Sequence, residues 1–441
     1  MYKNFNELYP NSLELKRSDK CAILINKSNT QISYNELIDR AESFAKKLIA
    51  AGITKKNRIL LNNQSLITNS IPELIGMLNV CSVCILNSNI RSAELDHLIS
   101  IGNFSGILDS SMSCDNFDLS KEGCDEKEGM CIISSGTSGK DTNLVSVPRT
   151  RFHYWAYNSM RMFGEDTRSL VVASLTFSAG SSHLISTLLN GGTAILATET
   201  IHGNAGPNSL KKAMEHEPNH IHGAPETYKI LMNMNVDSTS LRHCRITGSK
   251  SSTVLLNNIF DNISPDLINS VYGTNENGPA FVNIMKSKDE INESIGVPDE
   301  GYEYKIDESG QMWIRGGSGD IEFQNTEDLA EERDGKIYLT GRSGDVIINN
   351  SYCVVPSEVE DILEKCDNVD QVVVFGKKIE STSSKICCIY TVNDSYVDGH
   401  IEEYAKSSLS SYKIPVEWTK VKEIPMTVNA KISRAKLQNI F

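Results

Sequence analysis

Short apolar runs alternate with longer mixed segments along this chain, and that alternation most constrains its fold. The runs fall at residues 59–61, 129–134, 170–173, 193–197 and 271–272. Each run has the length of a strand, and the segments between them are long enough to form helices. Strands separated by helices favour parallel pairing, because the crossover helix returns the chain to the same end of the sheet. We therefore expect an α/β fold with mainly parallel sheets flanked by helices.

One helix can be bounded from local signals. Ser33 and Glu36 form a capping box, apolar residues recur on one face after them, and Gly52 is a typical stop. The sequence therefore predicts a helix from Ser33 to Gly52.

The chain is long enough for more than one folding unit, since it has 441 residues. Its C-terminal part predicts a helix from Pro356, with Ser357 and Glu360 as a capping box, and strands at 369–375 and 386–390. The glycines within residues 341–345 suggest a hinge. We expect a large N-terminal domain over residues 1–343 and a small, mobile α+β domain over residues 344–441.

Charge and composition exclude several functions. The net charge is −13, so no basic excess is available for nucleic acid or anionic lipid. The N-terminus has no signal-peptide pattern, and no apolar run reaches the roughly 18 residues of a membrane span. We expect a soluble cytoplasmic protein without nucleic-acid or membrane partners.

The cysteines and one histidine pattern could each indicate a metal site, but neither meets the requirements of one. The 11 cysteines are scattered, which favours reduced thiols, and Cys81 and Cys84 lie in an apolar run without a second ligand pair. His216 and His220 match H-E-x-x-H, but Pro218 would break the helix that this zinc motif requires. We interpret Cys81 and Cys84 as core residues and the histidine match as coincidence.

A loop rich in small and hydroxylated residues follows the apolar run at 129–134. It reads Ser134, Ser135, Gly136, Thr137, Ser138, Gly139 and Lys140. Small residues let backbone N–H groups approach an anion, and the hydroxyls and lysine add donors. The loop is therefore either a phosphate-binding loop or a flexible surface loop.

Several ordered segments together resemble the adenylate-forming superfamily of acyl- and aryl-CoA synthetases, peptide-synthetase adenylation domains and luciferases. The resemblance runs from about residue 20 to residue 441. The loop at 134–140 is similar to the family's phosphate loop, although residues 141–143 replace its Pro-Lys-Gly end. By this resemblance the loop contacts ATP, and Lys140 partly substitutes for the missing lysine.

Residues 269–276 resemble the family motif N-x-x-Y-G-x-T-E. The resemblance implies that Tyr272 stacks on adenine and that Glu276 helps to hold Mg²⁺, tasks that suit an aromatic face and a hard oxygen. Other residues implied to contact the nucleotide are Gly273, Thr274 and Asn275, with Asn275 replacing a threonine, and Gly248, Ser249 and Lys250. Gly248 and Thr274 are also implied to line the acyl pocket.

Two further segments match the part of the family that holds ribose and phosphate. Residues 326–329 resemble T-G-D-L, which assigns Asp328 to the ribose hydroxyls, and Arg342 follows at the family spacing as a second nucleotide contact. Residues 424–434 resemble L-P-x-T-x-x-G-K-[IV]-x-R, with Ala430 replacing the glycine. The family's lysine bridges the substrate carboxylate and ATP, so the resemblance makes Lys431 the catalytic residue.

The resemblance also bears on the substrate. Phe177 and Ser178 lie where amino-acid-activating members carry Phe-Asp, whose aspartate pairs with the substrate ammonium. Ser178 offers no charge, so an acyl or aryl acid is preferred to an α-amino acid.

The expected reaction is activation of a small carboxylic acid by ATP and transfer to a thiol, either CoA or carrier-protein pantetheine. Asn350 and Ser351 replace the family's paired glycines beside the pantetheine passage, and the acidic balance offers no patch for CoA phosphates. A carrier protein is therefore the favoured acceptor. Transfer to an amine, or a non-catalytic nucleotide-binding regulator with the same fold, are the alternatives.

Overall fold

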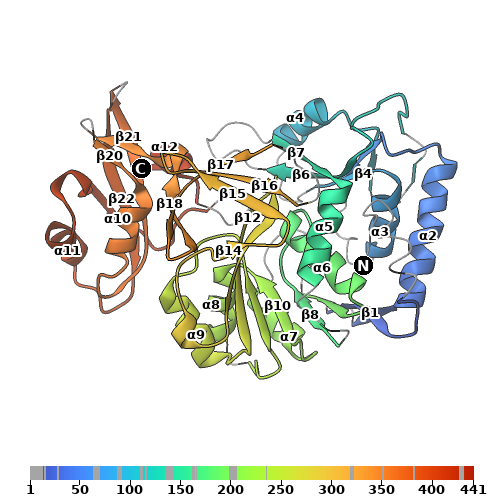
Figure 1. The fold of residues 1–441 in the computed structure, drawn as a ribbon, viewed down its shortest axis with the longest axis horizontal. Coiled ribbons are helices and arrows are strands. Elements are labelled where there is room, and N and C mark those ends of the chain that lie inside the picture. Colours follow the sequence, from blue (N-terminus) through green and yellow to red (C-terminus); the bar gives the residue numbers. More distant parts are fainter. Residues whose placement is uncertain are drawn as a thin grey trace. The chain divides into compact units, whose positions relative to one another are not determined.

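The described residues of the computed structural model form two compact units (Figure 1). The structure describes residues 13, 16–26, 29–62, 70–86, 92–109, 113–114, 117–134, 143–160, 164, 166–197, 206–234, 236–317, 322–349, 352–380, 383–426 and 432–441. The first unit contains described residues up to 134, within 142–303 and within 315–322. The second unit contains residues 304–314 and the described residues between 323 and 441.

The first unit has the predicted α/β architecture. Its strands are β1 (Cys21–Ile25), β2 (Thr30–Ser33), β3 (Arg58–Leu61), β4 (Ser82–Ile85), β5 (Gly106–Leu108), β6 (Glu128–Ser134), β7 (Asn143–Pro148), β8 (Arg168–Val171), β9 (Thr193–Leu196), β10 (His220–Gly223), β11 (His243–Ile246), β12 (Leu267–Thr274), β13 (Gly278–Met285) and β14 (Val297–Pro298). Its helices are α2 (Tyr34–Ala50), α3 (Ile71–Val80), α4 (Ser92–Gly102), α5 (Arg149–Met160), α6 (Ser178–Leu189), α7 (Pro207–Met214), α8 (Pro225–Asn233) and α9 (Thr253–Asn262).

Two sheets organise this unit. The larger has the order β14-β13-β12-β11-β10-β8-β9-β1-β2, and its strands from β12 to β1 pair in parallel. The smaller has the order β5-β3-β4-β6-β7 and is parallel except for the β6–β7 pair. Mainly parallel sheets flanked by helices confirm the predicted fold class.

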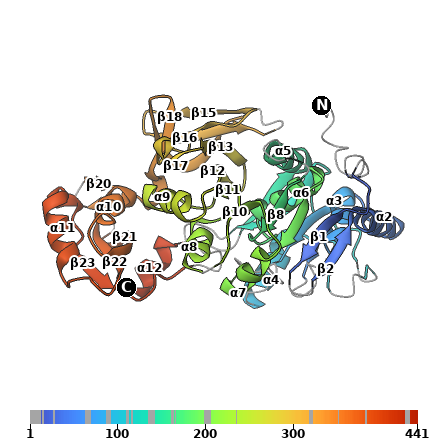
Figure 2. The ribbon, with the colours of Figure 1, turned by 90° about the horizontal axis from the view of Figure 1, so that it is seen from below.

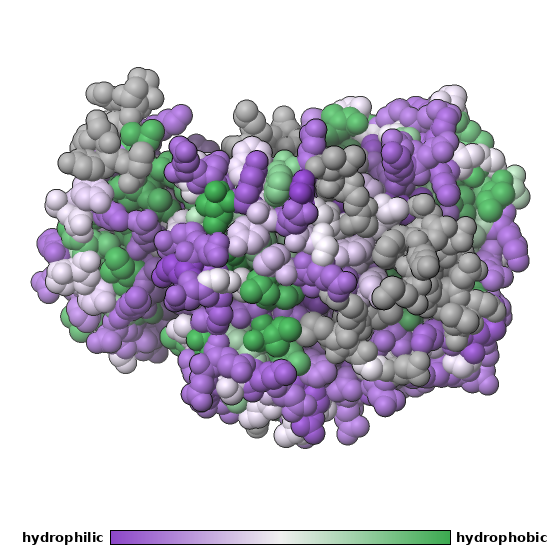
Figure 3. Space-filling model, in the orientation of Figure 1, coloured by the Kyte–Doolittle hydropathy of each residue, from purple (hydrophilic) through white to green (hydrophobic). Residues whose placement is uncertain are grey.

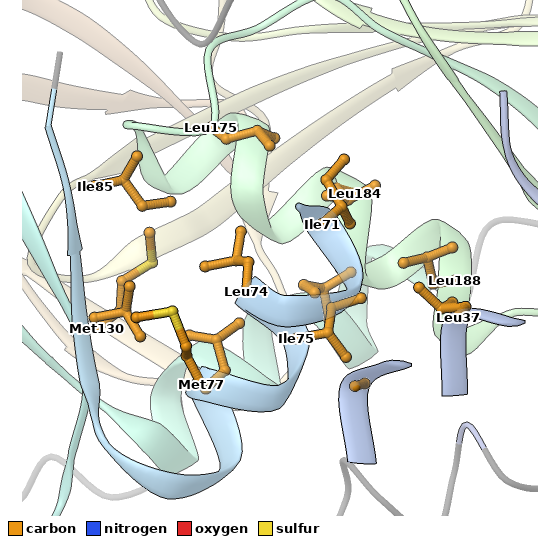
Figure 4. Close-up of a cluster of buried hydrophobic side chains, with 14 of the residues drawn as sticks. Leu37, Ile71, Leu74, Ile75, Met77, Ile85, Met130, Leu175, Leu184 and Leu188 are labelled. Carbon is orange, nitrogen blue, oxygen red and sulfur yellow. The ribbon is translucent and has the colours of Figure 1, made fainter. Parts of the chain in front are cut away.

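Helices fill the space between the two sheets. Figure 4 shows the apolar face of α6, with Leu184 and Leu188, near Ile71 and Leu74 of α3 in a single buried cluster. In both ribbon views α5 and α6 run side by side (Figure 1, Figure 2). The opposite face of the large sheet is covered by α7, α8 and α9, and that of the small sheet by α4. Both sheets are thus covered on both faces, as parallel sheets require.

The second unit is smaller. Its strands are β15 (Tyr302–Ile306) and β16 (Gln311–Gly316), which it shares in part with the first unit, then β17 (Gln324–Arg333), β18 (Lys336–Arg342), β19 (Ile347–Asn349), β20 (Tyr352–Val354), β21 (Val369–Glu380), β22 (Ser383–Val392) and β23 (Glu417–Lys420). Its helices are α10 (Pro356–Leu363), α11 (His400–Ser408) and α12 (Arg434–Ile440). The sheet β21-β22-β23 packs α10 and α11 on one face and α12 on the other.

This unit includes β17 and β18, which precede the predicted boundary between residues 343 and 344. Residues 343–345 form a short 3₁₀ turn directly after β18. A hinge within residues 341–345 stays a prediction.

Local sequence signals had mixed success. The predicted helix from Ser33 is α2, and the Ser33 side chain accepts the Glu36 N–H at 3.2 Å, which is one of the two bonds of a capping box. The Glu36 carboxylate accepts a hydrogen bond from Arg40 at 3.2 Å instead of completing the box. The capping box predicted at Ser357 is wrong. The N-cap of α10 is Val355, and the Ser357 hydroxyl donates instead to the Thr340 carbonyl at 2.6 Å. Ser357 therefore forms a hydrogen bond with strand β18 in place of the predicted cap within its own helix.

The visible surface is mainly hydrophilic, with separate apolar patches (Figure 3). Among the residues that the structure describes, every helix is too short or too polar to cross a bilayer.

Candidate active site

Several predicted site residues follow parallel strands of the large sheet. Phe177 and Ser178 come after β8, Gly248 comes after β11, and Tyr272 lies near the end of β12. Because these strands are parallel, their carboxyl ends lie at the same edge of the sheet. Open α/β sheets bind their ligands at this edge, so the sequence prediction and the topology point to the same place.

Tyr272 stands near the end of a tight strand pair. It lies opposite Phe281 on β13, and the two rings meet edge to face with centroids 6.0 Å apart. The next residue, Gly273, lies so close to β13 that a Cβ there would stand 1.9 Å from the Gly278 carbonyl oxygen. The half-buried tyrosine is therefore held by packing, and glycine is required beside it.

The turn after β12 is held by its own polar groups. The Thr274 hydroxyl oxygen accepts hydrogen bonds from the Asn277 backbone N–H at 3.0 Å and from its side-chain amide at 3.3 Å. Arg151 donates to the Glu276 main-chain oxygen at 2.5 Å, while Glu276 itself is exposed and Asn275 is half-buried. The main chain of Glu276 is fixed and its side chain is exposed.

The segment after β11 is exposed over residues 248–250. Gly248 has a φ of +102°, a conformation that side chains rarely adopt. The Lys250 ammonium forms an ion pair with Glu293 at 3.2 Å, so its charge is partly neutralised within the described residues. Ser249 is exposed beside it.

Phe177 and Ser178 begin α6. Phe177 is the N-cap residue, and its carbonyl accepts the Ser181 N–H at 3.1 Å and the Ser181 hydroxyl at 2.9 Å. Ser178 is the first helical residue and is half-buried, and the first turn of α6 contains no acidic residue. No carboxylate in this turn is therefore available for a substrate ammonium.

Asp328 and Arg342 lie in the second unit and face each other across β17 and β18. The Asp328 carboxylate accepts a charged hydrogen bond from Arg342 Nε at 3.0 Å, and 14% of the Asp328 side chain remains exposed. Glu327, the residue before Asp328, has a φ of +61°. That conformation favours glycine, which is the residue of the T-G-D-L motif at this position.

Asp328→Ala is expected to raise the apparent KM for ATP roughly tenfold to a hundredfold, because a lost charge-assisted hydrogen bond costs about 1.5–3 kcal/mol. Steady-state kinetics over a range of ATP concentrations measure the effect. Glu331→Ala on the same strand is the matched control, since Glu331 is exposed and pairs only with Arg333 among the described residues. An unchanged KM in the Asp328 variant would remove this residue from the nucleotide site.

Some predicted residues lie outside the described residues. They are Ser135, Gly136, Thr137, Ser138, Gly139, Lys140, Asn350, Ser351 and Lys431. The backbone of Ser134 is described and ends β6. The roles of these residues stay predictions.

A buried polar cluster lies on the face of the large sheet toward α6. We define this histidine–arginine cluster as Ser169 of β8, His183 of α6, His220 and His222 of β10, and Arg245 of β11. All five residues are buried. In both ribbon views α6 lies beside β8 and β10 (Figure 1, Figure 2). A covered parallel sheet ordinarily has apolar residues at such positions.

The register of the parallel strands places the residues of the cluster beside one another. Ser169 lies opposite His220, and His222 lies opposite Arg245. The Ser169 hydroxyl is 2.6 Å from His220 Nδ1 and 2.6 Å from His183 Nε2. Since a hydroxyl has one proton, at least one of these nitrogens must donate to it. The His183 and His222 rings meet edge to face with centroids 5.0 Å apart.

Burial determines the charge of the cluster. It lowers the pKa of His183 to about 3, with a further contribution from the Arg245 charge, and holds the pKa values of His220 and His222 well below their usual range. Burial also lowers the pKa of Arg245 to about 10. At neutral pH the histidines are therefore neutral and Arg245 is cationic.

The sequence prediction missed this cluster. Its signal is the alternation of polar and apolar residues in residues 220–223 and 243–246, which places His220, His222 and Arg245 on one face of two adjacent strands. His220 was considered only as part of the H-E-x-x-H match. The interpretation of that match as a coincidence agrees with the structure. Glu217 has a φ of +50° and His220 begins β10, so His216 and His220 share no helical face.

The predicted core role of the paired cysteines is confirmed. Cys81 and Cys84 are both fully buried, and each belongs to an apolar cluster. Burial raises the pKa of the Cys81 thiol to about 12. This thiol is unreactive at neutral pH.

Two family models match the chain in order. Residues 132–326 match the model described as AMP-binding enzyme, and residues 358–431 match the AMP-binding enzyme C-terminal domain. Together the two models cover more than half of the chain. They include most of the predicted site segments, among them the position of Lys431.

Known relatives are distant in sequence. The mitochondrial medium-chain acyl-CoA ligase ACSF2 of Bos taurus is 24% identical over 353 residues, which cover 69% of this chain and 56% of that protein. The chain thus spans about half the length of this relative. The 2-succinylbenzoate–CoA ligase of Listeria innocua is 23% identical over 457 residues, which cover 92% of this chain and 94% of that protein.

The fold is shared with solved structures. ATP-bound MatB from Rhodopseudomonas palustris superposes with a TM-score of 0.85 over 99% of this chain and 98% of that chain, at 15% identity. This similarity extends over the whole chain and concerns the fold.

Proposed function

The chain belongs to the AMP-binding enzyme family, and from this premise we propose that it is an AMP-forming acid–thiol ligase. It would activate a carboxylic acid as an acyl-adenylate and then transfer the acyl group to a thiol. The observation that carries the proposal is the convergence of residues 177–178, 248–250 and 272–276 on the carboxyl edge of one parallel sheet. These are the segments that the family resemblance assigns to acid and nucleotide.

In the first step a carboxylate oxygen forms a bond to the α-phosphorus of ATP as the bond to the leaving pyrophosphate breaks. A carboxylate is already ionised at neutral pH, so no general base is needed. The barrier comes from bringing two anions together, and fixed cations and N–H donors lower it. We assign this role to Lys431 and the loop at 134–140.

The described residues fit the nucleotide. Tyr272 offers a ring held in place by Phe281, and Asp328 offers an oriented carboxylate to ribose hydroxyls. Arg342, which orients Asp328, is itself partly exposed and offers a guanidinium to phosphate.

Glu276 fits a magnesium ion that is shared with ATP. Its side chain is exposed, and its main chain is fixed by Arg151. Mg²⁺ ordinarily takes one or two protein carboxylates together with substrate phosphates and water, so one glutamate suffices. When bound, the ion would neutralise phosphate charge.

The substrate is proposed to be an acyl or aryl acid. The first turn of α6 contains no acidic residue, and Ser178 stands at its start. The positive end of a helix dipole disfavours a substrate ammonium there. Free α-amino acids should therefore be poor substrates.

The acceptor is proposed to be a pantetheine thiol. Both relatives named above are CoA ligases, which supports a thiol of this class. The replacements at Asn350 and Ser351 favour a carrier-bound arm over free CoA. The cytoplasm, where ATP and reduced thiols are available, is the proposed location.

The test is pyrophosphate release by the full chain with ATP, Mg²⁺ and a panel of acyl, aryl, dicarboxylic and α-amino acids. Release should require an acid and should be slowest with the α-amino acids. CoA, a carrier protein and small amines, offered separately, then identify the acceptor. Hydrolysis of ATP that no acid stimulates would overturn the proposal, and fastest release with an α-amino acid would overturn the assignment of Ser178.

A further inference from the structure

Arg245 is an unusual arginine. Only 5% of it is exposed, yet its guanidinium makes no hydrogen bond or ion pair with any residue that the structure describes. The carboxylate that acts on it is Asp299, which contributes at longer range than an ion pair. A buried charge without a partner is strongly destabilising, and none of the described residues gives Arg245 a hydrogen bond or an ion pair.

The neighbours of Arg245 do not neutralise it. His183 and His222 are neutral at physiological pH, and each has one fully buried ring nitrogen without a hydrogen-bond partner among the described residues. Tyr228 is turned elsewhere, since its hydroxyl lies 2.8 Å from the Arg245 main-chain oxygen and 3.2 Å from that of Ile221. Within the part of the chain that the structure describes, the cluster therefore combines a positive charge that no ion pair offsets with unused polar atoms.

The position of this charge relates it to the proposed reaction. Arg245 lies three residues before Gly248, on the strand whose exposed end is predicted to contact nucleotide and acyl group. His222 is next to the last residue of β10 on the adjacent strand, in register with Arg245. The charge is thus buried one layer below the carboxyl edge at which the acid is expected to react.

We propose that Arg245 and His222 bind a second carboxylate at the far end of the substrate, so that the enzyme activates dicarboxylic acids. This inference rests on the proposed acid activation and specifies its substrate class. A guanidinium matches a carboxylate with two parallel N–H donors, and a neutral imidazole adds a further donor. One carboxylate balances one arginine, whereas a phosphate dianion would exceed it.

Monocarboxylic and dicarboxylic acids of equal chain length should differ in how well they bind beside Arg245. A monocarboxylic acid would place an apolar end beside a desolvated arginine, and a dicarboxylic acid would place its second carboxylate there. Truncating one partner of a buried charge pair typically weakens binding by a factor of about 30 or more. We therefore expect kcat/KM to favour the dicarboxylic acid by roughly a hundredfold at the best-fitting length.

The experiment compares acids in pairs, such as pentanoate with glutarate and hexanoate with adipate, by pyrophosphate release with saturating ATP. Arg245→Met should lower kcat/KM for the dicarboxylic acid roughly a hundredfold and leave that for the monocarboxylic acid unchanged or higher. Arg245→Lys keeps the charge without the fork and should retain part of the preference. Equal use of both acids by the wild type, or equal losses on both in Arg245→Met, would overturn the proposal.

A second readout does not depend on turnover. A dicarboxylic acid should raise the thermal midpoint of the wild type, and this shift should disappear in Arg245→Met. Without acid, Arg245→Met should be at least as stable as the wild type, because it removes a buried charge with which no described residue forms an ion pair. Arg149→Met is the matched control, since buried Arg149 donates to the Cys81 and Glu128 carbonyls and should lose stability without a change in acid preference.

Failure of the proposed function and failure of this inference give different results. Absence of pyrophosphate release with every acid would reject acid activation itself. Release with monocarboxylic acids and no preference for dicarboxylic acids would reject only the role of Arg245. If Arg245→Met does not fold, the same comparison in Arg245→Lys decides, and an unchanged preference there would also reject it.

Discussion

Lys431→Ala is expected to lower acid-dependent pyrophosphate release by about a hundredfold to a thousandfold, the range for losing one preorganised charge stabiliser. The described residues that flank the segment with Lys431 make specific contacts. Met426 and Ile432 form a β-bridge, and Arg434 makes two hydrogen bonds of 2.7 and 2.8 Å to the Glu360 carboxylate. The substitution should therefore remove one amine without unfolding the C-terminal unit.

Initial rates with a saturating acid measure this effect, and ATP binding measured separately should change little. Lys436→Ala is the matched control, because Lys436 is an exposed lysine of α12 close in sequence. Wild-type rates in the Lys431 variant would remove this residue from the mechanism, whereas an equal loss in both variants would indicate a general disturbance of the C-terminus.

Acidification below about pH 6.5 is expected to destabilise the first unit steeply. Unfolded histidines take up protons near pH 6.5, whereas burial lowers the pKa of His183 to about 3 and those of His220 and His222 well below their usual range. As the pH falls through this window the unfolded chain binds more protons than the folded chain, so stability is lost. Each such histidine contributes about 1.4 kcal/mol per pH unit.

Urea unfolding between about pH 6.5 and 5 measures this slope before most carboxylates titrate. With all three histidines neutral in the fold, the slope approaches about 4 kcal/mol per pH unit. His183→Phe should reduce it by about 1.4 kcal/mol per pH unit. Leu188→Ala, in the same helix, should lower stability at every pH and leave the slope unchanged, and a flat pH profile in the wild type would contradict the buried, neutral state of the cluster.

Much of the fold was predictable because local and tertiary forces agree there. The helix predicted from Ser33 is capped by the Ser33 hydroxyl, and the apolar runs at 59–61, 129–134 and 193–197 correspond to β3, β6 and β9. The strands β10 and β11 were not predicted, because each alternates polar with apolar residues where a covered parallel strand is ordinarily apolar. The histidines of β10 contact His183 of α6, which a single strand's sequence does not show.

Local signals failed where a tertiary contact was stronger. Ser357 and Glu360 have the spacing of a capping box, but Glu360 accepts the Val374 N–H at 2.7 Å and is paired with Arg434. Sequence spacing identifies which residues could cap a helix. It does not show which more distant groups compete for them.

Some residues of the candidate site could be predicted from local sequence motifs, and others could not. Tyr272, Gly248 and Asp328 were found through short motifs whose residues lie close in sequence, and the structure places each at a strand end or on a strand pair. The histidine–arginine cluster joins residues from α6 and three strands, so no short motif contains it. Arg245 and His222, which we propose to bind a second carboxylate, were therefore accessible only from the three-dimensional arrangement, whereas Ser178 was found from the sequence.

The central claim, that a carboxylate attacks the α-phosphate of ATP, is tested most directly by following oxygen. The acid is labelled with ¹⁸O in its carboxylate and incubated with the enzyme, ATP and an accepting thiol, and the products are analysed by mass spectrometry. AMP should carry one ¹⁸O atom from the carboxylate, and the pyrophosphate should be unlabelled. Unlabelled AMP, or ADP with labelled inorganic phosphate, would contradict this claim.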